Sequence, residues 1–197
     1  MRHSGPGLAP VARVKICVGL TGPNASGKGE VARFLEGKGF SLCSLSDVVR
    51  QEATRRGLDH SRENLIRTGT ALREQFGEGV LAQRTLPKIS QRSVVDSIRN
   101  PGEIQVLRTL PGFHLLGIDA PVALRFERSR RRGRVGDGET LEEFERKEIL
   151  EKASQGPGQQ LDVCLSQADL LVRNDGTLEE LHRKVEQALA FRGVPLS

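Results

Sequence analysis

Short apolar runs recur along the chain, and between them lie longer segments in which apolar positions follow a helical spacing. Five runs have the continuity of strands that are buried on both faces. They are VKICVGL (14–20), GFSLCSL (39–45), SVVDSI (93–98), FHLLGID (113–119) and ADLLVRN (168–174). The helical pattern covers 28–37, 46–56, 61–76, 78–88, 102–109, 121–131, 140–152 and 177–191. Buried strands that alternate with helices predict an α/β fold of three layers with a parallel five-stranded sheet.

Two stretches depart from this alternation. Residues 46–88 hold consecutive helical patterns without a strand, which predicts a helical insert. Residues 128–140, RSRRRGRVGDGET, are charged and interrupted by glycine, which predicts a mobile flap. The first twelve residues are rich in Gly and Pro, so we expect a loose tail at 1–12 and a single domain over 13–197.

Composition narrows the classes of function. Among the 197 residues no run approaches the roughly 18 apolar residues of a membrane span, and the N-terminus lacks the apolar segment of a secretory signal. The net charge of +5 favours anionic partners. Because there is no Trp or Tyr and only seven Phe, platforms for stacking single-stranded bases are scarce, which favours a nucleotide over a nucleic acid.

The cysteines indicate the redox environment. Cys17, Cys43 and Cys164 are isolated and lie in apolar stretches. We therefore expect buried, free thiols and a cytoplasmic protein.

The most specific motif is the turn GPNASGKGE that follows the first predicted strand. Gly22, Gly27 and Lys28 match the phosphate-binding pattern G-x-x-x-x-G-K. A strand leads into this loop and a helix begins at its end, so backbone N–H groups and the helix dipole face a phosphate. The glycines permit close approach of the backbone, and Lys28 is expected to reach the β- and γ-phosphates. The sequence therefore predicts a nucleotide-phosphate site.

The loop departs from the usual pattern at Gly29, where most such loops carry a Ser or Thr that binds Mg²⁺. The run GPNASGKG instead resembles the loop of adenylate kinase and its nucleoside monophosphate kinase relatives, which carry Gly and then Thr after the lysine. That resemblance implies ATP as the donor, with Mg²⁺ held largely through water, phosphates and a distal Asp. Glu30 stands where the family has Thr, and Ser26 offers another hydroxyl. The implied nucleotide contacts are Gly22, Asn24, Ala25, Ser26, Gly27, Lys28, Gly29 and Glu30.

The predicted insert begins with SLSDVVR, residues 44–50. Ser46 or Asp47 is expected to cap a helix, and by itself the run is an ordinary capped helix. After an adenylate-kinase-like loop, however, it resembles the S-x-G-D-x-x-R of nucleoside monophosphate kinases, whose Arg holds the acceptor phosphate. The resemblance implies that role for Arg50, with Asp47 beside it.

Residues 14–190 as a whole resemble a little-studied P-loop group of nucleotide kinase-like and dephospho-CoA kinase-like proteins. The shared features are LR-x-x-x-G, D-x-I-R followed by a Glu, an Arg-rich flap and N-x-G-T-L-E-E. On the insert, the resemblance places Arg67, Thr68 and Arg73 around an acceptor, although a solvated helix face explains them equally well. A dephospho-CoA kinase proper would typically show Ser at position 29 and a different third strand.

The segment SVVDSIRNPGE places charged groups at the end of a buried strand. Ligands bind at the carboxyl ends of parallel strands, and Asp96 lies at such an end. There it can hold a hydrated Mg²⁺, accept a proton from an attacking hydroxyl, or merely cap the strand. Arg99 can point at the same phosphates, whereas Glu103 is explained as a first-turn acid of the next helix.

The flap and the last strand complete the candidate site. Arginines on a closing lid stabilise charge that develops during phosphoryl transfer, and we assign this role to Arg128, Arg132 and Arg134. A nucleic-acid patch is the rival interpretation. Thr177 and Glu180 form a capping-box pattern, and similar kinases imply a contact of Asn174 with the donor adenine.

Together these features predict an ATP- and Mg²⁺-dependent phosphotransferase whose acceptor is a (deoxy)nucleoside monophosphate. Lys28, Asp96, Arg128 and Arg132 would be catalytic, with Asp96 holding the metal through water. Acceptor binding would fall to Asp47, Arg50, Arg67, Arg73, Arg99 and Arg134. The alternatives are a dephospho-CoA kinase-like enzyme, a P-loop ATPase or switch without a small acceptor, and a nucleic-acid-binding protein. The base, the sugar and the oligomeric state stay open.

Overall fold

The fold is built on five strands, each of which pairs in parallel with its neighbours. A computed structural model describes residues 15–133, 140–153 and 158–196, with only the backbone described at 150–153. The sheet has the order β2-β3-β1-β4-β5. Its strands are β1 (Ile16–Thr21), β2 (Ser41–Ser44), β3 (Arg92–Ile98), β4 (Phe113–Asp119) and β5 (Leu170–Arg173). The predicted α/β fold with a parallel five-stranded sheet is confirmed.

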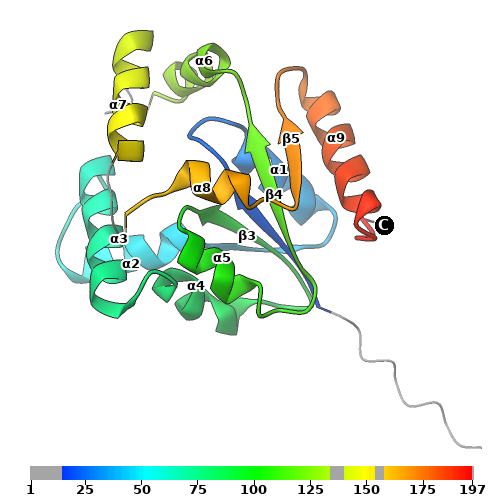
Figure 1. The fold of residues 1–197 in the computed structure, drawn as a ribbon, viewed down its shortest axis with the longest axis horizontal. Coiled ribbons are helices and arrows are strands. Elements are labelled where there is room, and N and C mark those ends of the chain that lie inside the picture. Colours follow the sequence, from blue (N-terminus) through cyan, green and yellow to red (C-terminus); the bar gives the residue numbers. More distant parts are fainter. Residues whose placement is uncertain (1–14, 134–139, 154–157, 197) are drawn as a thin grey trace, which may run out of the picture.

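Helices cover both faces of this sheet (Figure 1). They are α1 (Lys28–Gly37), α2 (Leu45–Arg55), α3 (Arg62–Phe76), α4 (Val80–Thr85), the 3-10 helix η1 (Leu86–Lys88), α5 (Pro101–Leu107), α6 (Val122–Arg132), α7 (Leu141–Ala153), α8 (Leu161–Ser166) and α9 (Leu178–Phe191). Side chains of α1 and α9 share one core cluster with the sheet, and side chains of α2, α4, α5 and α8 share the other. The result is the three-layer arrangement that the sequence predicts.

Alternation along the strands explains the two cores. In β1, Cys17 belongs to one cluster and Val18 to the other, and in β4 Leu115 and Leu116 divide in the same way. All four side chains are fully buried. Strands with both faces covered read as continuous apolar runs, which is why the sequence shows them so plainly.

The strand order places one site at the centre of the sheet. β1 lies between β3 and β4. From β1 the strand order continues to β3 and β2 on one side and to β4 and β5 on the other, so the end of β1 is a topological switch point. Ligands of open parallel sheets bind outside the carboxyl ends of the strands at such a point. The glycine-rich loop connects β1 to α1 there.

Several local predictions are confirmed. Thr177 and Glu180 form a capping box at the start of α9. Cys17, Cys43 and Cys164 are free and buried, and burial raises the pKa of Cys17 and of Cys164 to about 12. Within the described residues, no helix combines the length and the apolar character that crossing a membrane requires.

Two local details differ from the prediction. The cap of α2 is Ser44 rather than Ser46 or Asp47, because the helix begins directly after β2 and both residues fall in its first turn. Helix α8 was not predicted; it is a single short helix, whose Leu161 and Cys164 are buried three residues apart. The expected tail at 1–12 lies outside the described residues, as do Arg134 and Asp137 of the expected flap.

Candidate functional site

The phosphate loop depends on two glycines. Gly22 has φ 137° and Gly27 has φ 109°, values that side chains rarely adopt. A Cβ on Gly22 would lie 2.0 Å from the backbone oxygen of Ile118, and a Cβ on Gly27 would lie 2.2 Å from Nδ2 of Asn174. Neighbouring segments thus fit tightly against the loop at both positions.

Lys28 lies against its own loop. Its Nζ donates to the carbonyl oxygens of Gly22 and Pro23, both at 2.7 Å. Burial, and then the charge of Arg99, lower the pKa of Lys28 to about 7, although Asp96 acts in the opposite direction. A bound phosphate would supply the negative charge that this crowded cationic position lacks.

Glu30 points away from the loop's phosphate side. Its carboxylate pairs with Arg33 one turn along α1, and its N–H donates to the oxygen of Gly27 at 3.0 Å. Glu30 is not among the residues that line the cavity described next. The first N–H groups of a helix lack acceptors in a preceding turn, so this end of α1 is suited to an anion.

A cavity of about 700 Å³ opens beside the loop. Its walls come from the loop, the ends of β2 and β3, helices α2 and α3, and residue 159. The polar lining residues are Asn24, Lys28, Ser44, Ser46, Asp47, Arg50, His60, Ser61, Arg62, Arg73, Asp96, Ser97, Arg99, Arg132 and Gln159. The remaining lining is Ala25, Gly29, Leu42, Leu45, Val49, Leu65, Ile66, Gly69 and Leu81.

Arg73 is the most firmly held arginine of this cavity. It donates from Nε and Nη2 to Oε1 of Glu103 at 3.0 and 2.7 Å, and the two side chains are only 4% and 0% exposed. The other oxygen of Glu103 accepts the backbone N–H groups of Arg99 and Asn100 at 2.8 and 3.1 Å. Glu103 therefore orients Arg73 toward the cavity and fixes the turn that carries Arg99.

Arg50 and Arg99 lie in the same cavity lining. Arg50 donates from Nη1 to Ser46 at 2.7 Å and to Asp47 at 2.9 Å. Arg99 donates from Nη1 to Oε1 of Gln159 at 2.8 Å. The structure thus brings together three of the arginines that the sequence assigns to acceptor binding.

Two other residues of α3 lie differently. Arg67 is exposed, donates to Asn64 at 2.9 Å and is not part of the cavity lining. Thr68 is buried, and its hydroxyl has no hydrogen-bond partner in the part of the chain that the structure describes.

Asp96 is presented by an irregularity of β3. Between the pairs Gly19–Val95 and Thr21–Ile98 the register shifts, so that two residues of β3 face one residue of β1. Ser97 occupies this bulge with φ 68°, a strained value for a residue other than glycine. Its hydroxyl lies 3.4 Å from Oδ2 of Asp96 and 3.4 Å from the hydroxyl of Ser44.

Two buried oxygens near the loop are candidates for ligand contacts. Oδ1 of Asp96 and the hydroxyl of Ser26 have no hydrogen-bond partner in the described parts of the chain. A lone carboxylate beside a phosphate loop suits a Mg²⁺ ion that keeps several waters and binds mainly to nucleotide phosphates. The described residues contain no group of three or more His, Cys, Asp or Glu side chains that would form a metal cage.

The arginines of α6 have different surroundings. Arg132 reaches the cavity lining. Arg128 donates instead to the backbone oxygen of Asn174 at 3.2 and 3.3 Å and to its Oδ1 at 3.3 Å. Arg125 is buried and pairs with Glu148 of α7. The first arginines of the predicted flap are therefore helical, and Arg134 lies outside the described residues.

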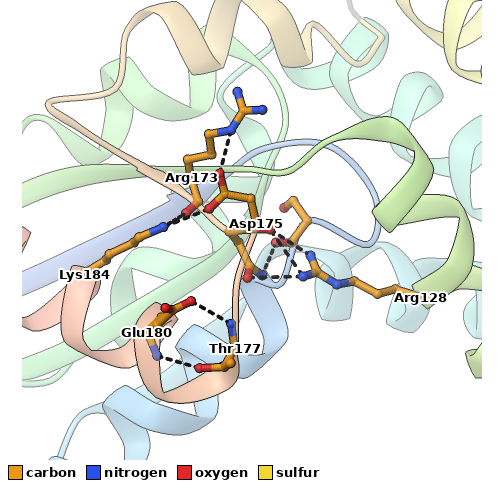
Figure 2. A network of polar contacts seen from close by, with 8 residues as sticks. Arg128, Arg173, Asp175, Thr177, Glu180 and Lys184 are labelled. Atoms are coloured by element: carbon orange, nitrogen blue, oxygen red, sulfur yellow. Dashed lines mark hydrogen bonds and ion pairs between the residues drawn. The ribbon is translucent and has the colours of Figure 1, made fainter.

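Asn174 lies next to the loop through its side chain. Its Nδ2 donates to the oxygen of Ser26 at 2.8 Å, and the residue is 6% exposed. Figure 2 shows Arg128 reaching toward the turn that carries Asp175 and Thr177.

Sequence reasoning missed several cavity residues. Ser44 and Ser97 lie at strand ends, so their positions beside Asp96 were a usable signal. His60, Arg62 and Gln159 also line the cavity. They reach it through tertiary packing, and Gln159 is far from the other lining residues in sequence, so no local motif marks them.

Comparison with known proteins agrees with this architecture. A family model described as "AAA domain" matches residues 21–145. A UPF0200 protein of Pyrococcus horikoshii is 34% identical over 180 residues, which cover 87% of this chain and 94% of that protein. A UPF0200 protein of Hyperthermus butylicus is 33% identical over 180 residues, covering 89% and 94%.

Among solved structures, shikimate kinase from Acinetobacter baumannii in complex with shikimate aligns with a TM-score of 0.60 at 16% identity, over 93% of this chain and 97% of that one. At that identity the likeness concerns the fold alone. The narrower resemblance to adenylate kinase stays a prediction. The chain belongs to the UPF0200 family and to the AAA-domain family, and it has the fold of a P-loop kinase.

Proposed function

We propose that this protein transfers the γ-phosphoryl group of Mg²⁺·ATP to a (deoxy)nucleoside monophosphate. The observation that carries the proposal is the cavity, which joins Lys28 of the phosphate loop to Arg50, Arg73 and Arg99. At about 700 Å³ it has the size of a small-molecule site, since such sites span about 300–1,000 Å³.

The charge of the lining supports two anionic ligands. Its basic side chains are Lys28, Arg50, Arg62, Arg73, Arg99 and Arg132, and its carboxylates are Asp47 and Asp96. One phosphate chain on the loop would leave most of the arginines available for a second anion. Bidentate recognition of phosphate is the particular strength of arginine.

The apolar part of the lining supports an acceptor with a flat or aliphatic body. Leu45 and Val49 of α2 and Leu65 and Ile66 of α3 all line the cavity. Side chains of this kind bury the faces of a nucleobase through apolar contact rather than aromatic stacking.

In this proposal the residues act as follows. Lys28 leaves the carbonyls of Gly22 and Pro23 and donates to the transferring phosphoryl group. Arg132 adds positive charge to the same group, and Arg50, Arg73 and Arg99 hold the acceptor phosphate in line. Such pre-placed charges are worth most in a site from which water is excluded.

Asp96 is the residue that would hold the magnesium ion, through water, beside the phosphates. When bound, Mg²⁺ neutralises charge on the β- and γ-phosphates and orients them for transfer. Oδ1 of Asp96 is buried and has no hydrogen-bond partner among the residues that the structure describes, and only glycine fits at positions 22 and 27; both observations are consistent with a nucleotide there.

The experiment is a panel of acceptors with Mg²⁺·ATP, scored by ADP formation and by identification of the phosphorylated product. The panel holds the common ribo- and deoxyribonucleoside monophosphates, dephospho-CoA and a reaction without acceptor. We expect one or a few monophosphates to raise the rate at least about a hundredfold over the acceptor-free reaction, and Lys28→Met to abolish that increase.

Three outcomes would count against the proposal. Hydrolysis of ATP at the same rate with and without every acceptor would indicate an ATPase or switch. Phosphorylation of dephospho-CoA alone would place the nucleophile on a hydroxyl rather than on a phosphate. Near-normal turnover in Lys28→Met would contradict the mechanism.

A further inference from the structure

The turn between β5 and α9 is held in a fixed shape by charged groups (Figure 2). Asp175 accepts from Nε of Arg173 at 3.0 Å and from Nζ of Lys184 at 2.9 Å. The same Nζ donates to the backbone oxygen of Arg173 at 2.9 Å. These contacts tie the end of β5 to the second turn of α9.

The start of α9 adds a second restraint. The N–H of Thr177 donates to Oε2 of Glu180 at 2.9 Å, and the N–H of Glu180 donates to the hydroxyl of Thr177 at 3.2 Å (Figure 2). Asn174 lies inside this braced turn, and its own N–H donates to the oxygen of Asp119 at 2.7 Å. Its backbone is therefore fixed from both sides.

The side chain of Asn174 leaves the turn and meets the phosphate loop. Nδ2 donates to the oxygen of Ser26 at 2.8 Å, across 148 positions of sequence. The amide occupies the space that a Cβ on Gly27 would fill, since such a Cβ would lie 2.2 Å from Nδ2. Asn174 and Ser26 are both buried, so water does not compete freely for this bond.

Arg128 of α6 determines the orientation of the Asn174 side-chain amide, that is, which side its oxygen faces and which side its nitrogen faces. Its Nη2 lies 3.3 Å from Oδ1 of Asn174, and its Nη1 and Nη2 lie 3.2 and 3.3 Å from the backbone oxygen of the same residue. A guanidinium has donors only, so it selects the amide oxygen and leaves the amide nitrogen for Ser26.

The bond to Ser26 has a consequence for the next N–H group. In a planar trans peptide the C=O and the following N–H point in opposite directions. Holding the oxygen of Ser26 therefore holds the N–H of Gly27, which begins the turn that leads into α1. This is the position at which a helix N-terminus binds an anion.

We propose that Asn174 is a positioning residue of the phosphate loop, which aims the N–H of Gly27 at a nucleotide phosphate, and that Arg128 orients the Asn174 amide for this purpose. The proposal rests on the proposed function for the identity of the ligand, a nucleotide phosphate. Asn174 then acts through the loop rather than by touching the adenine, and Arg128 acts through Asn174.

The test uses Asn174→Asp in the full chain, because aspartate keeps the shape and an acceptor for Arg128 but has no donor for Ser26. Two readouts are followed: the backbone ¹H–¹⁵N signal and exchange rate of Gly27 without ligand, and the dissociation constant of the non-hydrolysable analogue AMPPNP. We expect exchange at Gly27 to be faster, and AMPPNP binding weaker, by about tenfold or more.

Thr177→Ala is the matched control. It breaks the capping box in the same turn but leaves the bond from Asn174 to Ser26 in place. It should lower the melting temperature and leave both the Gly27 signal and the AMPPNP dissociation constant at their wild-type values. A general loosening of the turn would move both variants together and would overturn the proposal.

Arg128→Ala provides a second variant, which removes the part-buried contacts of Arg128 with Asn174, for the case that Asn174→Asp does not fold. It should shift the Gly27 signal in the same direction and weaken AMPPNP binding about threefold. The proposal is wrong if either variant folds and keeps the wild-type Gly27 signal and exchange. If wild type does not bind AMPPNP while the Gly27 signal still depends on Asn174, the proposed function fails and the positioning role stands.

Discussion

Arg73 and Glu103 form an ion pair across 30 positions of sequence, at 2.7 Å, with hardly any exposure on either side. One carboxylate oxygen of Glu103 accepts a hydrogen bond from Arg73, and the other accepts one from the backbone of the turn after β3. A charged cavity wall and a helix start thus share one carboxylate.

Removing that carboxylate should be costly. Glu103→Ala leaves a buried guanidinium without its partner, and we expect a loss of about 3–5 kcal/mol in the free energy of unfolding. Urea denaturation monitored by circular dichroism gives the value. Glu186→Ala is the control, because Glu186 pairs with Lys38 at 2.9 Å while both side chains are well exposed, and it should cost less than about 1 kcal/mol. Similar losses in the two variants would contradict the role given to Glu103.

Nucleotide binding should take up a proton near pH 8. The pKa of Lys28 is about 7 in the free protein, far below the ordinary 10.5, and a phosphate favours the charged form. Above pH 7 the affinity for AMPPNP should therefore fall, by up to about tenfold for each pH unit. Calorimetry at pH 8 in buffers of different ionisation enthalpy measures the proton directly, and Lys28→Met should abolish the uptake. Equal binding heats in all buffers would contradict the shifted pKa.

The same group affects the stability of the free protein, with a definite sign. Between about pH 7 and pH 10.5 the unfolded chain binds the Lys28 proton and the folded chain has released it. Unfolding then takes up a proton, so the contribution of Lys28 makes stability rise with pH across this range. Comparison of the slope of unfolding free energy against pH in wild type and in Lys28→Met isolates that contribution.

Alanine should be tolerated unequally in the phosphate loop. At Gly22 a Cβ would meet a backbone oxygen at 2.0 Å in a left-handed conformation, whereas at Gly29 nothing lies within 4 Å. We expect Gly22→Ala to destabilise by at least about 2 kcal/mol and Gly29→Ala, in the first turn of α1, to stabilise by up to about 1 kcal/mol. The melting temperatures of both variants, measured by thermal unfolding, test this expectation. Equal melting temperatures would contradict the difference in available space between positions 22 and 29.

Ser97 should show the signature of a strained backbone. Its φ of 68° suits glycine, so Ser97→Gly should change the free energy of unfolding by less than about 1 kcal/mol. Ser97→Val places a β-branched side chain in the same conformation and should cost about 1–3 kcal/mol. If valine is tolerated as well as glycine, the left-handed conformation at this bulge is wrong.

The sequence was sufficient to predict the fold, because parallel strands that are buried on both faces appear as continuous apolar runs. The short helix α8 was not predicted, because Leu161 and Cys164 supply only one repeat of a helical pattern. The cap of α2 is Ser44 because the helix begins directly after β2. Side-chain preferences for capping positions do not indicate that the connection between strand and helix is absent.

The site was predictable where it is local. The loop motif and Asp96 each follow directly from a strand end, whereas Arg50 was assigned through the resemblance to nucleoside monophosphate kinases. Arg67 could have been separated from Arg73 by helical geometry alone, since six residues correspond to about 240° around a helix. The face that reaches the cavity runs through Arg62, Leu65, Ile66, Gly69 and Arg73.

Contacts between distant segments were beyond the sequence. No local pattern shows that Glu103 accepts hydrogen bonds from Arg73, or that Arg128 donates to Asn174. Such contacts depend on the positions at which the helices pack against the sheet, and these positions are determined by packing over the whole domain.

The bond between Asn174 and Ser26 also imposes an order on biosynthesis. Asn174, which we propose holds a peptide plane of the phosphate loop, follows Ser26 by 148 positions, so the loop leaves the ribosome well before its partner. A nascent chain that still lacks β5 holds the complete glycine motif but not its brace. On this proposal, competence to bind a nucleotide tightly is acquired only after β5 has been synthesised and has joined the sheet.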